Sequence, residues 1–127
     1  MKYIVETDKS VEQAVADVEA ATKDHSFGVL HIHDLQQTMK NKGVDFPNAC
    51  QILEICNPHK AHAVLTADMS MNMALPCRIS VYSENGQTKI GMIKPKAMLA
   101  ALSDSVDLLK VAEEVEEATI AIIEQAK

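Results

Sequence analysis

The sequence is poor in aromatic and arginine side chains. Its 127 residues include no Trp, 2 Tyr and 2 Phe, and among the 12 basic residues Arg78 is the single arginine. Base stacking requires aromatic platforms, and binding to a phosphate backbone requires clustered cations. Because the formal net charge is −6, we expect no nucleic acid among the partners.

Long apolar runs are also missing. No stretch of about 18 apolar residues occurs, so we expect no membrane span. Glu6 and Asp8 come too early in the chain for the apolar segment of a secretory signal. The 3 cysteines are an odd number and too few for a disulfide scaffold. These features together predict a cytoplasmic protein with reduced thiols.

Apolar residues and helix signals are present in the amounts that one compact domain needs, and we expect residues 1–127 to form it. Alternating apolar residues and turn signals predict strands at 2–7, 27–33, 49–56, 77–83 and 88–94. Helical spacing and capping signals predict helices at 10–24, 35–42, 57–67, 96–102 and 104–126. The stretch 68–75 is expected to be a Met-rich connection.

The order of these elements favours an α+β fold. Asn85-Gly86 is typical of a tight hairpin and makes the last two strands antiparallel. We therefore predict a two-layer sandwich, with a largely antiparallel sheet of about five strands and helices mostly on one face.

Two side-chain patterns follow from these elements. In strand 27–33, alternation predicts one face made of Gly28, Leu30 and Ile32, and an opposite face made of Phe27, Val29, His31 and His33. In the last helix, spacing predicts an apolar stripe of Val106, Leu109, Val115, Ala118 and Ile122, with Leu108, Ala112 and Ile123 beside it, opposite a solvated face of Glu113, Glu114, Glu116 and Glu117.

Two cysteine motifs stand out. Leu-Glu-Ile-Cys-Asn-Pro spans Leu53–Pro58, Leu-Pro-Cys-Arg-Ile spans Leu75–Ile79, and Ala67-Asp68 lies between them. These motifs and their separation resemble the domain-of-unknown-function 302 family, and the resemblance covers nearly the whole chain. It implies a small α+β domain with a TATA-binding-protein-like fold, and a homodimer. It implies no particular activity.

The thiols are the first candidates for chemistry. Cys56 ends a strand directly before a helix N-terminus, a position that stabilises a thiolate, whereas the alternative is a small packed residue. Cys77 would allow disulfide exchange or soft-metal ligation if its strand lies beside that of Cys56. Cys50 is about 20 Å from Cys56 along an extended strand, so we interpret it as a packing residue.

A metal site is a second hypothesis. Cys56, His59 and His62 have the spacing C-x-x-H-x-x-H and supply one thiolate and two imidazoles, but no fourth ligand follows from the sequence. The run Met69, Met71 and Met73 resembles a Cu(I)-binding spacing, although flexible packing residues explain it more simply. A soft transition metal is therefore a candidate cofactor.

A polar sheet face is the third hypothesis. Strand alternation places polar side chains of three strands on one face if the strands are neighbours: His31, His33, Glu54, Cys56, Arg78, Ser80 and Tyr82. Arg78 is suited to a carboxylate or phosphate, or alternatively to an ion pair with Glu54. General acid–base catalysis by Glu54 and His31 is a further alternative.

We therefore predict a dimeric binding domain, rather than an enzyme, for a small anionic ligand or a soft metal. Eight residues form the predicted ligand site: His31, His33, Glu54, Cys56, Asn57, Cys77, Arg78 and Tyr82. The first alternative is a thiol-dependent redox protein or enzyme using Cys56 with Cys77, and the second is a structural dimerisation module. We assign no catalytic residue.

Overall fold

One antiparallel sheet, covered by helices on one face, forms the protein. The computed structural model describes residues 1–127. Its strands are β1 (Lys2–Thr7), β2 (Gly28–Asp34), β3 (Cys50–Cys56), β4 (Cys77–Glu84) and β5 (Gln87–Ile93). Its helices are α1 (Val11–Asp24), α2 (Leu35–Asn41), α3 (Pro58–Ala67), α4 (Pro95–Ala100) and α5 (Val106–Ala126), with a 3-10 helix, η1 (Met69–Ala74). The predicted α+β class is confirmed.

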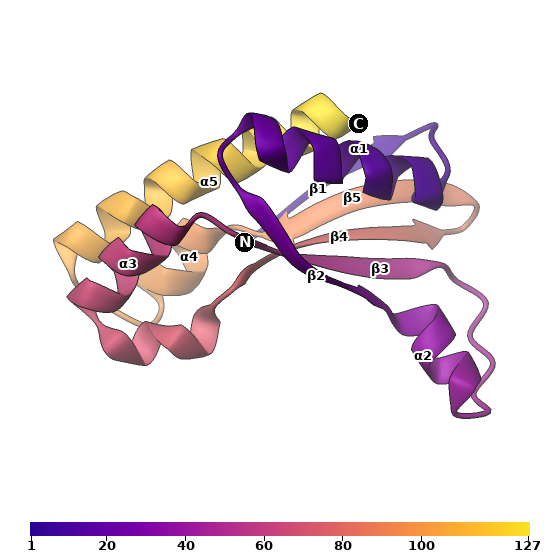
Figure 1. Ribbon diagram of the computed structural model, residues 1–127, viewed down its shortest axis with the longest axis horizontal. Coiled ribbons are helices and arrows are strands. Elements are labelled where there is room, and N and C mark those ends of the chain that lie inside the picture. Colours follow the sequence, from indigo (N-terminus) through magenta and orange to yellow (C-terminus); the bar gives the residue numbers. More distant parts are fainter.

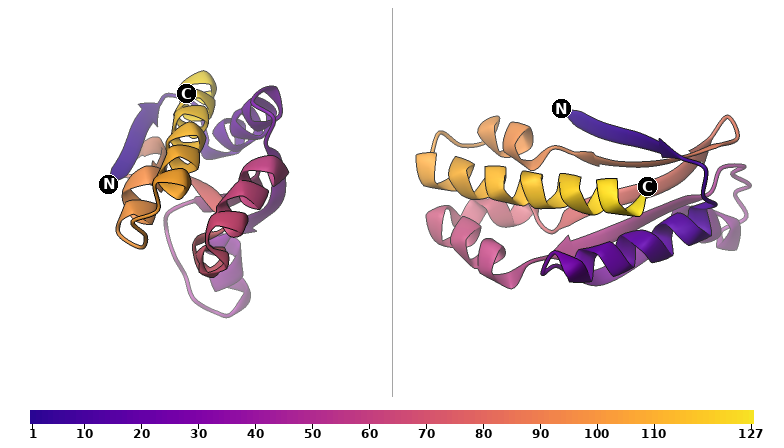
Figure 2. Two further views of the ribbon diagram at one scale, coloured as in Figure 1. Left: turned by 90° about the vertical axis from the view of Figure 1, so that its left-hand side faces the viewer. Right: turned by 90° about the horizontal axis from the view of Figure 1, so that it is seen from above.

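The sheet has the strand order β1-β5-β4-β3-β2, and every neighbouring pair is antiparallel. Helices α1 and α5 lie side by side over one face, while α3, α4 and η1 gather at one end of the molecule (Figure 1; Figure 2). No helix lies over the central strands on the opposite face, which we call the open face (Figure 1).

Local signals explain where the elements begin and turn. The hydroxyl of Ser10 accepts a hydrogen bond from the backbone N–H of Gln13, 3.1 Å away, and caps α1. Asn85 and Gly86 have φ values of 53° and 77°, the left-handed conformation that a two-residue hairpin of this kind requires. The stretch predicted as a connection after α3 is wound into η1 instead, and Asp68 caps it through Ser70.

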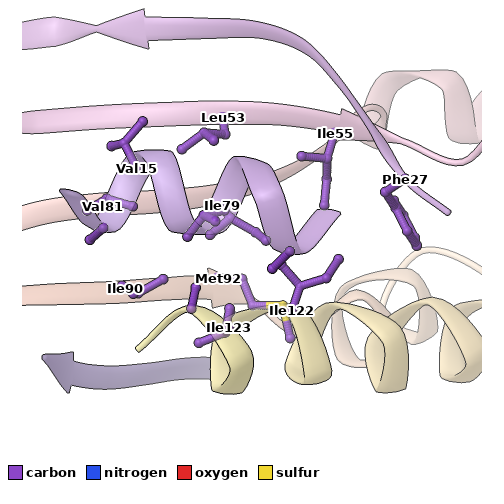
Figure 3. Packing of buried hydrophobic residues seen from close by; sticks show 14 of the residues in the cluster. Val15, Phe27, Leu53, Ile55, Ile79, Val81, Ile90, Met92, Ile122 and Ile123 are labelled. Carbon is purple, nitrogen blue, oxygen red and sulfur yellow. The ribbon is translucent and has the colours of Figure 1, made fainter. Parts of the chain in front are cut away.

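The main core lies between the sheet and helices α1 and α5 (Figure 3). Leu53, Ile55 and Ile79 from β3 and β4 are fully buried against it. A second, smaller cluster gathers beyond the end of the sheet, where Val64 of α3, Leu99 of α4 and Ala112 of α5 meet. The protein therefore has two apolar clusters rather than one continuous core.

Strand β2 contains a bulge that the alternation did not predict. Val29 pairs with Ile55 and His31 pairs with Glu54, so Leu30 is the extra residue and is 62% exposed. Phe27 and Val29 therefore pack toward the helices, and the prediction that they share a face with His31 is wrong. The prediction that Leu30 shares a face with Ile32 is also wrong.

The apolar side of α5 agrees with the prediction at Leu108, Ala112, Val115, Ile122 and Ile123, with Leu109 and Ala118 partly buried, and differs from it at Val106. Val106 follows the cap residue Ser105 and is 81% exposed. The buried residues of the helix are Leu108, Ala112, Val115, Thr119, Ile122, Ile123 and Ala126. On the opposite side, Glu114 pairs with Lys60 of α3 and Glu113 pairs with Lys96 of α4. The acidic face of α5 thus contacts both neighbouring helices as well as solvent.

Strands β4 and β5 are paired along only part of their length. Their ladder runs from Glu84↔Gln87 to Ser80↔Gly91. Beyond it, Cys77–Ile79 pairs with β3 alone, and Met92–Ile93 pairs with β1 alone. The two strands separate at the end of the sheet next to α4 (Figure 1). We call this opening the split.

None of the helices combines the length and apolarity that a bilayer crossing requires.

Candidate functional site

The two cysteine motifs meet where β3 and β4 lie side by side at one end of the sheet. Strand β3 ends at Cys56, and the next residue, Asn57, caps α3 by accepting hydrogen bonds from the N–H groups of His59 (3.0 Å) and Lys60 (3.3 Å). Strand β4 begins at Cys77, which is in register with Ile55. The register therefore brings both motifs to one end of neighbouring strands.

A cavity of about 260 Å³ lies at this junction. Of the 17 residues that line it, 13 are hydrophobic. They come from both apolar clusters, with Phe27 and Ile55 on one side and Val64 and Leu99 on the other. The cavity is therefore a gap between the two clusters.

Three of the predicted ligand residues, Cys56, Asn57 and Cys77, line this cavity. Arg78 does not, because successive residues of β4 point to opposite faces and the side chain of Arg78 reaches the open face. The single predicted site is therefore divided between the inside of the protein and its open face.

The Cys77 thiol is held in its neutral form. The pKa of Cys77 is raised from 9.0 to about 11, mainly by burial and to a smaller extent by the nearby Cys56 thiol, while Arg78 acts in the opposite direction. All three cysteines are free. At neutral pH Cys77 is thus an apolar wall residue of the cavity and a poor nucleophile.

Cys50 lies at the other end of β3, opposite Tyr82. Burial, followed by the charge of Asp34, raises the pKa of the Cys50 thiol. Cys50 does not line the cavity. It serves as a natural reference thiol in experiments on the other two cysteines.

Glu54 links three strands on the open face. Its Oε1 is 2.8 Å from His33 Nε2, and its Oε2 is 3.8 Å from Arg78 Nη2. The ring of His31 packs edge-on against that of His33, with the ring centres 4.4 Å apart. The bulge at Leu30 makes this arrangement, because it turns His31 and His33 toward Glu54.

A groove of about 430 Å³ runs along the open face beside this cluster. Arg78, Ser80 and Tyr82 line it from β4, and Lys2 and Ile4 line it from β1. Gly91 forms part of its floor, where a Cβ atom would come within 3.1 Å of Ile4 and of the Tyr3 carbonyl oxygen. Of the predicted ligand residues, Arg78, Tyr82 and Cys77 line the groove.

Comparison with known proteins agrees with the motifs. The family model described as "Domain of unknown function DUF302" matches residues 3–126. The chain belongs to the DUF302 family. A crystal structure of an uncharacterized conserved DUF302 protein from Bacillus stearothermophilus is similar to this chain, with 33% sequence identity and a TM-score of 0.93. The match covers 99% of this chain and 98% of that one. No curated protein matches.

The proposed metal ligands of this DUF302 chain do not come together. No group of three or more His, Cys, Asp or Glu side chains is arranged to hold a metal ion. His59 and His62 are exposed on α3, whereas Cys56 is half-buried at the end of β3 and lines the cavity. A helix that starts after Cys56 carries both histidines away from the thiol, so the set Cys56, His59 and His62 is not assembled.

The methionine run is divided by the 3-10 geometry of η1. Met71 is buried in the smaller apolar cluster, while Met69 and Met73 are 67% and 82% exposed. Met73 lines the groove. The three sulfur atoms thus have different surroundings rather than one shared site.

Several residues of the DUF302 site were not predicted from the sequence. Met98 and Leu99 of α4, and Ala112 and Val115 of α5, form the far wall of the cavity. A helix is predicted at 96–102, but nothing in the local sequence shows that this helix packs against the end of β4. These residues reach the site through tertiary packing alone.

Proposed function

We propose that this protein binds a small molecule whose apolar part occupies the cavity between α3, α4, α5 and the ends of β3 and β4. The observation that supports this most directly is a cavity of about 260 Å³ whose wall contains Cys56 and Cys77, one from each motif. The cavity is partly open to solvent, and concave sites lined mainly by apolar side chains are where small molecules bind. A gap of this size between two clusters is therefore a reasonable ligand site.

The size of the cavity indicates the size of the ligand. An apolar cavity of about 150 Å³ binds benzene, so the cavity here has room for an apolar group of roughly six to ten carbon atoms. The neutral Cys77 thiol and the 13 hydrophobic residues of the wall support an apolar group over a soft metal. Binding without catalysis, in the cytoplasm where thiols stay reduced, is the function we propose.

Binding of 1-octanol, followed by calorimetric titration, tests this proposal. Ala61 of α3 lines the cavity, whereas Ala63, on the same helix, does not. We expect the native protein to bind 1-octanol, Ala61→Leu to weaken the binding at least tenfold by filling the space, and Ala63→Leu to leave it within twofold. Absence of binding to the native protein, or equal binding by the two variants, would contradict the proposal.

Self-association is a second candidate function, and the open face supports it. Ile4 and Ile93 are 47% and 54% exposed there, and Met73 at its rim is 82% exposed. Apolar side chains gathered on an uncovered sheet face are typical of a protein–protein contact. As an alternative to a ligand in the groove, we propose that a second copy of the chain covers this face in a homodimer.

Light scattering of the purified protein tests this second proposal. We expect a mass twice the 13.9 kDa of the chain. Ile93→Glu should give the monomer mass, because it introduces a charge into the contact. Leu102→Glu, an exposed position outside the open face, is the matched control and should leave the dimer intact. A monomeric native protein would overturn this candidate.

A further inference from the structure

We infer that the ligand is an amphipathic carboxylate, whose alkyl tail lies in the cavity and whose carboxylate lies in the groove against Arg78. This inference rests on the proposed function and names the class of molecule that the same site takes. A medium-chain monocarboxylate of about eight carbons fits the cavity size discussed above. Three observations carry the inference: the shared wall of the two hollows, the charge of the groove, and the state of Arg78.

The cavity and the groove meet at the split. Five residues line both: Ala74, Pro76, Cys77, Pro95 and Met98. They lie where β4 has separated from β5 and pairs with β3 alone. Residues of β5 and α5 below the sheet, Met92 and Thr119, also border the groove at this point. A chain molecule that occupies both hollows would therefore pass between these shared residues at the split, where no paired strands lie between the open face and the apolar interior.

The groove is positively charged in an acidic protein. Among the 16 residues that line it, Lys2 and Arg78 are the charged ones, and the nearest carboxylate, that of Glu54, pairs with Arg78 at 3.8 Å from beside the groove rather than from its wall. The chain as a whole has a formal net charge of −6. An anion is thus drawn to the groove rather than to the rest of the surface. The hydroxyl groups of Ser80 and Tyr82 provide further hydrogen-bond donors in the same wall.

Arg78 has donors available for this anion. Its guanidinium forms no hydrogen bond within the protein, and its closest acidic partner, Glu54, is 3.8 Å away. Glu54 in turn is engaged by His33 at 2.8 Å. A guanidinium with unused N–H groups suits a carboxylate, which it binds through two parallel hydrogen bonds. Arg78 is next to Cys77 in the chain, so the cation lies directly beside the split.

Titrations with a matched pair of ligands test this inference. Octanoate and 1-octanol have the same carbon number and differ in the charge of the head group. We expect the native protein to bind octanoate at least tenfold more tightly than 1-octanol. Arg78→Gln should abolish this preference while leaving the affinity for 1-octanol within twofold. Lys42→Gln, which makes the same charge change at an exposed position outside the groove, should keep the preference.

The outcomes separate this inference from the proposed function. Equal binding of octanoate and 1-octanol, unchanged in Arg78→Gln, would overturn the carboxylate site but leave the apolar cavity site standing. Absence of binding of either ligand would overturn both. A preference for octanoate that Arg78→Gln preserves would place the carboxylate away from Arg78 and would also overturn the inference. Acetate, which lacks a tail, should bind at least a hundredfold more weakly than octanoate.

Discussion

Ser80 of β4 and Gly91 of β5 form the last paired position of their ladder, and beyond them the two strands separate. This relationship connects the two halves of the candidate site. The hydroxyl of Ser80 and the bare backbone of Gly91 lie in the groove on the open face, and the split next to them leads to the cavity. The cysteine motif at the start of β4 is the edge of that opening.

Replacing Gly91 with alanine should destabilise the protein. The added Cβ would lie 3.1 Å from the Ile4 side chain and 3.1 Å from the Tyr3 carbonyl oxygen, and the backbone of β1 cannot move without breaking its pairing. We expect a loss of about 1–3 kcal/mol in the free energy of unfolding, measured with urea. The double variant Gly91→Ala/Ile4→Ala relieves one of the two contacts and should recover only part of the loss relative to Ile4→Ala. A stability equal to that of the native protein would show that β1 adjusts freely.

Alkaline pH should reveal the buried thiol of Cys77. The native protein keeps this proton up to a pKa of about 11, whereas the unfolded chain releases it near 9.0, so the stability that the neutral thiol provides is complete below pH 9 and is lost as the pH rises through 11. Between pH 8 and pH 11, the free energy of unfolding of the native protein should fall by about 2 kcal/mol more than that of the Cys77→Ala variant. Urea unfolding at each pH measures both values. Parallel pH curves for the two proteins would contradict the burial of this thiol.

Asn57 should be needed for the position of α3. It accepts hydrogen bonds from the N–H groups of His59 and Lys60 at the start of the helix that forms one cavity wall. Asn57→Ala should lower the free energy of unfolding by about 1 kcal/mol and weaken 1-octanol binding, because the first turn of α3 loses its cap. Asn57→Asp keeps the acceptor and should restore both properties. If Asn57→Asp behaves like Asn57→Ala, the amide acts on the ligand rather than on the helix.

Ligand binding should protect one end of β3 from alkylation and not the other. Cys56 lines the cavity, while Cys50 lies at the opposite end of the same strand. With octanoate at ten times its dissociation constant, the reaction of Cys56 with N-ethylmaleimide should slow roughly tenfold, followed by mass spectrometry of the peptides. The rate at Cys50 should not change. Equal slowing at both cysteines would indicate a general stabilisation of the fold instead of occupation of the cavity.

Much of the fold could be predicted because its signals are local. The cap at Ser10, the hairpin at Asn85-Gly86 and the Asn57-Pro58 helix start each depend on residues adjacent in the chain. The bulge at Leu30 could not be predicted, because it depends on how β2 pairs with a strand more than 15 residues away. The exposure of Val106 similarly follows from where α5 extends past the sheet.

The candidate site could be predicted only in part. The motifs gave Cys56 and Cys77, and the strand register places them beside each other. Cys77 and Arg78 were predicted to belong to one site because they are adjacent in the motif. In the strand, their side chains point to opposite faces of the sheet. The split that joins the two faces is a property of tertiary structure, because Met92 and Ile79 have ordinary strand sequences around them but do not pair.

A crystal structure with 8-bromooctanoate would test most directly whether the cavity is a ligand site. The bromine atom marks the end of the tail and is located by its anomalous scattering. We predict a bromine peak inside the cavity, among Val64, Leu99 and Ala112, with the carboxylate at Arg78. A bromine peak confined to the open face, or anywhere outside the cavity, would contradict the proposed function.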